Sequence, residues 1–387
     1  MKNKTRNRVK NIFVLLLTLC GIVGILIYPE VSCDSAEQAI EMCLTVLVPT
    51  LFPFLVLSGI FIKCGFAERL GRLLDRFTKK VFCVGGNCSS AMILGLVSGF
   101  PVGAKTVSSL YKNGACSKVE AERTLAFCNN AGPSFILGTV GVGIWQSGKT
   151  GWLLWAVQIV PAVFVGIIVG RIWKGTADTV VFVNTKNNIP QKQSVLHIFL
   201  SSVTDGAVSM LYICSFVVFF AVAVSLLLHT GLIPSISAAI CKLFPFFERE
   251  TVENLLVGIF EMTTGVSRVG NSAPVLQNLA VTSALIGWAG ISVHCQVLSY
   301  ICDGGLSPKP YFIGKILQTA FATALIFICS FLIPGYKADI LPSSEIPQIS
   351  VYALVCGAVV AFSLTVLFLL FRSKKQTEKT VKFSRKP

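Results

Sequence analysis

Long apolar runs recur along the whole chain, and they constrain its fold more than any other feature. Of the 387 residues, 53% are hydrophobic and 13% are charged, and the mean hydropathy is +0.74. A run of about 20 apolar residues is long enough to cross the hydrocarbon core of a bilayer as a helix. The sequence therefore predicts an all-α polytopic membrane protein with about eight transmembrane helices and two shorter, Gly-rich apolar stretches. The expected spans are residues 12–28, 39–62, 125–144, 152–173, 207–228, 279–301, 311–333 and 351–371.

The basic residues indicate a topology. A net charge of +15 is compatible with a nucleic-acid partner, but the Lys and Arg residues fall between the expected spans rather than within one folded domain. With a cytoplasmic amino terminus and alternating spans, 28 of the 33 Lys and Arg residues lie on the cytoplasmic side, Lys309 and Lys315 among them. Cytoplasmic loops of membrane proteins carry such an excess. We therefore expect a multi-pass cell-membrane protein with both termini in the cytoplasm and no nucleic-acid partner.

The amino-terminal segment and the cysteines have simple interpretations. Residues 1–30 have the basic start and apolar core of a signal peptide, but the apolar run is long and no A-x-A site follows it. Residues 1–34 are therefore expected to remain as a transmembrane anchor. The fourteen cysteines contain no C-x-x-C pair and lie mostly within spans, which favours small buried side chains over metal ligands or disulfides. No cofactor is expected, apart from a possible coupling cation or proton.

The two halves of the chain share an order of features. At an offset of 163 residues, Gly95 aligns with Gly258 and Lys105 with Arg268. Counting spans gives the halves opposite orientations, and inverted repeats with broken hydrophobic segments are typical of secondary transporters with a site near the bilayer midplane. The first predicted repeat is 35–173, with a hairpin at 86–110 and a broken helix at 122–144. A cytoplasmic linker at 174–198 connects it to a second repeat at 199–335, which has a hairpin at 252–274 and a broken helix at 277–301. A last transmembrane helix at 349–371 and a basic cytoplasmic tail at 372–387 follow.

Two motifs in the first half predict interrupted helices. The stretch GLVSGFPVGAK, residues 95–105, is too short to cross the bilayer and too rich in Gly for one continuous helix, so we expect a re-entrant hairpin with its tip near residues 99–103. In LAFCNNAGPSFILG, residues 125–138, Pro133 opens the helix around 129–132, where Asn129, Asn130 and Ser134 supply polar atoms. These residues are candidates for a substrate or ion site. The alternatives are glycines that allow close helix packing and asparagines that bond neighbouring helices.

The second half has polar residues at corresponding places. Glu261 lies among apolar residues beside Thr263 and Thr264, and a carboxylate near the membrane interior is a candidate for binding a substrate, cation or proton. A structural ion pair with Arg268 is the alternative. In GWAGISVHCQVLSY, residues 287–300, the polar atoms come from Ser292, His294 and Gln296, and His294 is either a titrating group or a packing residue.

Lys105 and Arg268 follow the two Gly-rich stretches at matching positions. Together with helix amino ends they favour an anionic, carboxylate-bearing solute. The alternative is that both side chains extend to the membrane surface as anchors. The expected binding residues are therefore Lys105, Asn129, Asn130, Ser134, Glu261, Thr263, Thr264, Arg268, Ser292, His294 and Gln296.

Over residues 40–330, the motifs GLVSGFPVGAK, LAFCNNAGPSFILGTVGVG, GIFEMTTG and GWAGISVHCQVLS resemble those of the sporulation integral membrane protein family YlbJ. That family carries the nucleoside-recognition or Gate domain and is distantly similar to concentrative nucleoside transporters. The resemblance implies a protein of the mother-cell-derived membrane around the forespore that moves dipicolinate, a small aromatic dicarboxylate. The resemblance also implies that this chain folds into hairpins and broken helices, but it does not identify particular binding residues.

Three classes of function remain open at this point. A transporter or facilitator for a small organic anion is the first, with a nucleoside-type solute as its variant. A structural or signalling membrane protein needed for sporulation is the second, and an oligomer is possible in either case. An enzyme is not expected, because the sequence lacks H-E-x-x-H, G-x-S-x-G and P-loop patterns.

Overall fold

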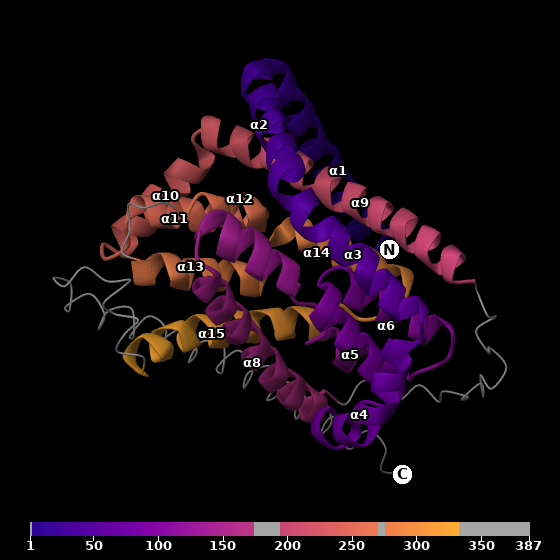
Figure 1. The fold of residues 1–387 in the computed structure, drawn as a ribbon. Coiled ribbons are helices and arrows are strands. Elements are labelled where there is room, and N and C mark those ends of the chain that lie inside the picture. Colours follow the sequence, from indigo (N-terminus) through magenta and orange to yellow (C-terminus); the bar gives the residue numbers. More distant parts are fainter. Residues whose placement is uncertain (1, 174–193, 270–274, 333–387) are drawn as a thin grey trace, which may run out of the picture.

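The computed structural model describes residues 2–173, 194–269 and 275–332, and within these ranges every regular element is helical (Figure 1). The first half contains α1 (Lys2–Ile27), α2 (Pro29–Met42), the π-helix η1 (Cys43–Leu47), α3 (Val48–Lys63), α4 (Phe66–Phe82), α5 (Gly86–Ser98), α6 (Val102–Lys112), α7 (Lys118–Leu125), the π-helix η2 (Ser134–Ile144) and α8 (Gly148–Ile172). The second half contains α9 (Val195–His229), α10 (Leu232–Leu243), α11 (Arg249–Phe260), α12 (Met262–Ser267), α13 (Val275–Trp288), α14 (Gly290–Asp303) and α15 (Lys309–Leu332).

Five of the described helical segments are long and apolar enough to cross a membrane, and a sixth span arises if α4 and α5, bent by 93°, are taken together. The five are Pro29–Lys63, Gly148–Ile172, Val195–His229, Leu276–Asp303 and Lys309–Ser330. Three of the eight expected spans are not among these five helical segments of the described residues. The run at 125–144 is interrupted between α7 and η2, and within the described side chains of α1 the apolar stretch is Val14–Ile27. The expected span at 351–371, the basic tail and residues 174–193 of the linker lie outside the described residues.

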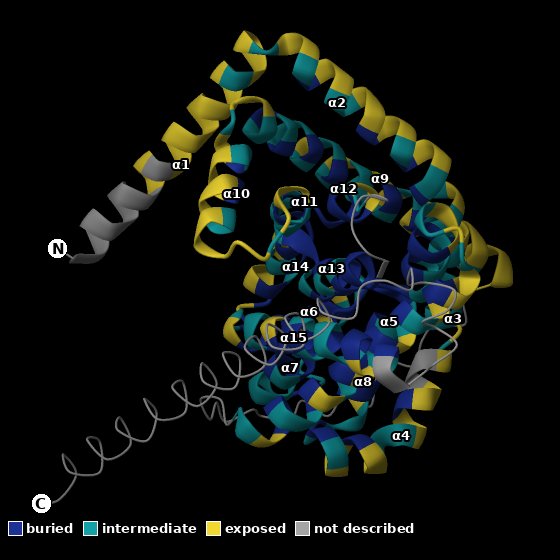
Figure 2. Cartoon of the chain, turned by 90° about the vertical axis from the view of Figure 1, so that its left-hand side faces the viewer, coloured by how far each residue is buried: buried dark blue, intermediate teal, exposed yellow. Residues whose placement is uncertain are grey.

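The core lies between the two halves. Buried residues concentrate in α5 to α8 and α13 to α15, whereas α1 and α2 are largely exposed and α1 projects away from the rest (Figure 2). Exposed Leu, Ile and Val side chains along α1 suit contact with lipid. The helices that surround the polar breaks are therefore the best-packed part of the molecule.

The helices follow one another in a similar order in the two halves. The segments Pro29–Lys63 and Val195–His229 are each 35 residues long, and α3 packs against α9. In each half there follow a shorter helix (α4 or α10), a helix pair (α5 with α6, or α11 with α12), an interrupted helix (α7 with η2, or α13 with α14) and a long span (α8 or α15). The two long spans α8 and α15 also pack against each other. Helices at corresponding places in the two halves thus contact one another.

Glycine allows the α5 and α6 pair to lie directly on the backbone of residues 126–133. A Cβ at Gly95 would lie 1.7 Å from the carbonyl oxygen of Cys128, and one at Gly103 would lie 2.4 Å from the same atom. Gly99, between the two helices, has φ +76 and faces the amide of Gly132. Positive φ values and such close backbone approach are open to glycine and unfavourable for other residues. The G-x-x-x-G-x-x-x-G spacing of this motif is therefore required by packing against the break.

The second interrupted helix breaks at Ala289 and Gly290, whose φ values are +78 and +77. A positive φ is uncommon for alanine and is maintained only where the surrounding structure determines it. Gly290 lies against the amide of Met262, so this break meets the one between α11 and α12. In each half, the interrupted helix thus touches the turn of the preceding helix pair.

Candidate functional site

A small cavity lies where the turns of the two helix pairs meet the interruptions of the two interrupted helices, and we call it the central cavity. Its volume is about 60 Å³, which is enough for a few water molecules or an ion. Lining residues come from the turn between α5 and α6, from the start of η2, from the start of α12 and from α14, with an apolar wall from η1, α3 and α9. Five of the sequence-predicted residues line it, namely Ser134, Glu261, Thr263, Ser292 and Gln296.

Glu261 is the charged group of the central cavity. The residue is 1% exposed and connects α11 to α12, and its carboxylate accepts hydrogen bonds from the amides of Thr263 (3.1 Å) and Thr264 (2.5 Å). Among the described residues, no Lys, Arg or His lies within ion-pair distance of this carboxylate. The ion pair with Arg268 weighed from sequence is therefore not formed, since Arg268 is exposed and its guanidinium donates to Asn254 (3.3 Å).

Residues with hydroxyl groups line the cavity together with Glu261. The Oγ atoms of Ser98 and Ser292, which both line the cavity, are buried and have no hydrogen-bond partner among the described residues. Thr264 Oγ1 is also buried without a hydrogen-bond partner among the described residues, but Thr264 is not among the residues that line the cavity. Buried polar atoms in native proteins nearly all have partners, so unpaired hydroxyls around a cavity point to a bound ion, solute or water. Most of the cavity wall is apolar, and its one carboxylate together with these hydroxyls suits a cation or a small hydrogen-bonding solute.

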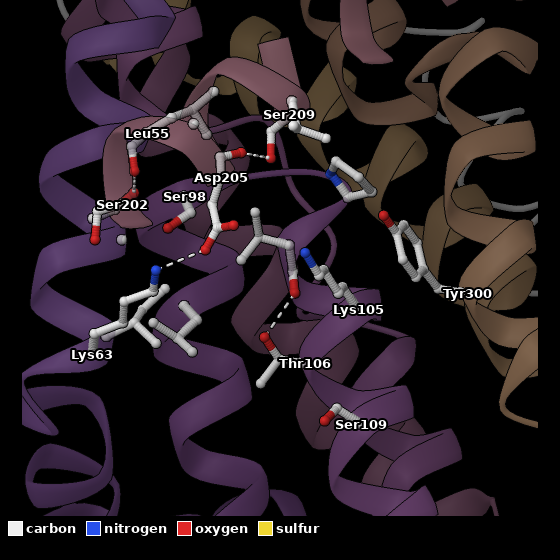
Figure 3. A pocket seen from close by; sticks show the side chains of 18 of the residues that line it. Leu55, Lys63, Ser98, Lys105, Thr106, Ser109, Ser202, Asp205, Ser209 and Tyr300 are labelled. Atoms are coloured by element: carbon white, nitrogen blue, oxygen red, sulfur yellow. Dashed lines mark hydrogen bonds and ion pairs between the residues drawn. The ribbon is translucent and has the colours of Figure 1, made fainter. Parts of the chain in front are cut away.

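A larger cavity of about 550 Å³ adjoins the central cavity, and we call it the vestibule (Figure 3). Helices α3, α5, α6, α9 and α14 form its walls. Lys63 donates to Asp205 (2.7 Å) across it, and the side chains of Lys105, Thr106 and Ser109 line the α6 side. Leu55 and Ser98 line both cavities. The vestibule therefore leads toward the central cavity from one side.

The two adjacent asparagines lie beside the central cavity rather than among its lining residues. Asn130 is fully buried, its side-chain amide donates to the carbonyl of Phe127 (2.7 Å), and its oxygen accepts from Gln318 on α15 (2.7 Å). The amide of Gln318 also lies 3.3 Å from the carbonyl oxygen of Gln158 on α8, and Gln158 donates to the carbonyl of Ser283 on α13 (2.8 Å). Asn130 thus belongs to a buried network that joins the two halves. The side chain of Asn129 donates to the carbonyl of Leu125 (3.1 Å).

His294 is a packed aromatic residue in this structure. Its Nδ1 lies 2.7 Å from the hydroxyl of Tyr311, and its ring lies against Trp288, Tyr311 and Phe312. The ring is buried and is not among the residues that line the two cavities.

Lys105 and Arg268 are not brought together. Lys105 is exposed and lines the vestibule, whereas Arg268 follows α12 and lines neither of these two cavities. A shared anion site for the two, as their matching positions suggested, is therefore absent from the described arrangement.

Sequence reasoning missed a buried cation, Lys315. Lys315 was assigned to the cytoplasmic charges, but it is 1% exposed on the long span α15, which corrects that assignment. Its ammonium donates to Gln318 (3.1 Å) and lies 5.2 Å from the ring centre of Phe100. The signal was present in the sequence, because Lys315 stands within an expected span at 311–333. Ser98 and Phe100 of the central cavity lie in the Gly-rich motif but were not singled out.

The fold and the cavities define an integral membrane protein whose interrupted helices meet at a buried polar site. Residues 44–148 match the Gate family, described as nucleoside recognition. The chain is also 28% identical over 333 residues to the sporulation integral membrane protein YlbJ of Bacillus subtilis (strain 168), covering 82% of this chain and 81% of that protein. These two matches confirm the resemblance to YlbJ and its Gate domain. Comparison with solved structures gives no match.

Proposed function

We propose that the chain is a transporter or facilitator for a small organic anion, with the central cavity as its translocation site. One observation supports the proposal most directly: the interrupted helices of both halves converge on a cavity that contains a buried carboxylate and adjoins an open vestibule on one side. Irregular backbone at membrane depth is tolerated where it is buried in protein or lines a water-filled cavity. Transporters place their sites at such breaks, at the interface between repeats.

The packing of the helices supports an inverted repeat. By their order along the chain, α6 corresponds to α12, α7 to α13, η2 to α14 and α8 to α15. The contact of α6 with α14 therefore has its counterpart in that of α12 with η2. In the same way, the contact of α7 with α15 has its counterpart in that of α13 with α8. The pairs α3 with α9 and α8 with α15 convert into themselves when the halves are exchanged. A twofold relation of this kind gives a protein two similar conformations, one open to each side. The described state has the vestibule open on one side and a central cavity too small for an organic solute, so a second state must widen it.

The charges support an orientation and a solute class. The vestibule contains Lys63, Lys105 and one carboxylate, that of Asp205. If the basic loops are cytoplasmic, as the positive-inside rule implies, the vestibule opens to the cytoplasm and both termini lie there. The excess of positive charge around the vestibule would attract anions. A volume of 550 Å³ lies in the range of small-molecule sites.

Similarity to YlbJ supports a role in sporulation and makes dipicolinate the first solute to test. Glu261 would bind a coupling cation or proton, because it lines the cavity that we propose as the translocation site. No chemical step is needed for such a role, and the protein would act as a carrier rather than as an enzyme.

The test is uptake of radiolabelled dipicolinate into proteoliposomes that contain the purified full-length chain. We expect uptake above that of protein-free vesicles, and a loss of at least about tenfold in Glu261→Gln, which removes the charge but preserves the shape of the side chain. Glu253→Gln is the matched control, because Glu253 is a carboxylate on α11 that pairs with Arg249 at the surface. Equal dipicolinate content in vesicles with and without protein would instead favour a structural or signalling role.

A further inference from the structure

Lys315 is a buried cation that the proposed function does not yet use. It is 1% exposed within the span Lys309–Ser330, and one of its three N–H groups donates to Gln318 (3.1 Å). Among the described residues, no carboxylate lies within 4 Å of its ammonium. Ionisable side chains inside a membrane protein are expensive to bury and mark pathways for solutes, ions or protons.

Phe100 connects this cation to the central cavity. The ring of Phe100 lies at the turn between α5 and α6 and lines the cavity, and the Lys315 ammonium lies 5.2 Å from its centre. The charge is therefore one aromatic ring away from the site. Glu261 lines the same cavity without a cationic partner. The central cavity is thus associated with two separate charges of opposite sign, a carboxylate at its wall and an ammonium next to Phe100.

We propose that Lys315 sets the charge selectivity of the central cavity, and that its ammonium attracts a carboxylate of the solute across or beside the Phe100 ring. This inference rests on the proposed function, and it assigns the solute to the carboxylates. An ammonium buried in a low-dielectric interior acts over a longer range than one in water, so direct contact in the described state is not required. The surface cations Lys105 and Arg268 are not buried beside the central cavity in this way.

A purely structural lysine is the alternative. In that case Lys315 would serve only to orient Gln318, which donates to Asn130. The loss of this contact would impair the transport of every solute equally. A charge that selects the solute, in contrast, changes the preference among solutes of the same shape and different charge.

The experiment compares three probes in proteoliposomes: dipicolinate, picolinate and the neutral pyridine-2,6-dicarboxamide. The variants are Lys315→Met and Lys315→Arg, with Lys309→Met as the matched control, because Lys309 is an exposed lysine on the same helix. We expect Lys315→Met to lower the ratio of dipicolinate to dicarboxamide flux by about tenfold or more, with Lys315→Arg restoring much of it and Lys309→Met leaving it unchanged.

A flux ratio in Lys315→Met equal to that of the unmodified chain, or an equal loss for all three probes, overturns this inference while leaving anion transport intact. Absence of dipicolinate flux in the unmodified chain contradicts the proposed function itself. If Lys315→Met does not reach the membrane, Phe100→Ala takes its place. Removal of the ring exposes the ammonium to the cavity, so the ratio should rise, and an unchanged or lower ratio counts against the role of Lys315.

Discussion

Asn130 illustrates how a polar residue at a helix break can be structural. Its side chain is fully buried and bonded at both ends, to Phe127 within its own segment and to Gln318 on α15. Buried amides that are satisfied by other protein groups stabilise one arrangement of neighbouring helices. The break at residues 126–133 is thereby fixed to the opposite half of the molecule.

Replacement of Asn130 by Ala should therefore lower stability. Loss of the side chain removes the shortest hydrogen bond of the Gln318 amide and leaves a small void, and such changes cost about 1–3 kcal/mol. The measurement is thermal unfolding of the purified chain in detergent. Asn113→Ala is the control, because Asn113 is exposed after α6. An unfolding temperature equal to that of the unmodified chain would show that the network contributes nothing.

Single polar residues at breaks could be predicted in part. The sequence indicates Ser134, Glu261, Thr263, Ser292 and Gln296 because polar side chains are costly in an apolar run that only crosses the bilayer. These five residues line one cavity, and their role in binding stays a prediction. The partners of Asn129 and Asn130 could not be foreseen, since they depend on which helices become neighbours. Lys315 was missed because counting charges by loop ignores how far a lysine stands inside a span.

At the scale of elements, the hairpin of α5 and α6 depends on glycine. The sequence predicted an interrupted Gly-rich segment, and the structure has helices that end at Ser98 and restart at Val102. The reason for the regular glycine spacing emerges only from the fold, because the glycines face the backbone of residues 126–133. The opening expected around residues 129–132 lies within the interruption between α7, which ends at Leu125, and the π-helix η2, which begins at Ser134. The run at 125–144, which was counted as one span from its hydropathy, is therefore not one continuous helix.

Substitution of Gly95 by Ala should destabilise this packing. The added methyl group would overlap the carbonyl oxygen of Cys128, and overpacking of this kind typically costs about 1–3 kcal/mol. Gly148→Ala is the matched control, because a Cβ there meets nothing within 4 Å. The readout is the amount of folded protein by size-exclusion chromatography in detergent together with its unfolding temperature. Identical behaviour of the two variants would contradict the close approach.

At the scale of the whole molecule, the described state is open on one side. Ser109 lies in the exposed vestibule, whereas Ser292 lies 1% exposed in the central cavity. If the molecule rests in this state, the two positions differ in access to water. The similar order of helices in the two halves could be predicted from the sequence, but the conformation that the chain prefers could not, because it is set by contacts between distant helices.

Cysteine accessibility tests this state. In a background with the native cysteines replaced, a membrane-impermeant maleimide applied to the cytoplasmic side should label Ser109→Cys rapidly and Ser292→Cys at least about tenfold more slowly. Addition of the reagent to the other side should label neither. Rapid labelling of Ser109→Cys from the outside only would reverse the proposed orientation, and equal labelling of both variants would contradict the closed central cavity.

Ser98 and Leu55 belong to the walls of both cavities, and so form a neck between them. A small molecule bound between the two cavities would block the passage of solute, and it would reach this position from only one side of the membrane. Inhibition of such a protein would then be sided: the same compound would act when supplied in one compartment and remain inert in the other, which offers a pharmacological means of telling the two faces of the membrane apart.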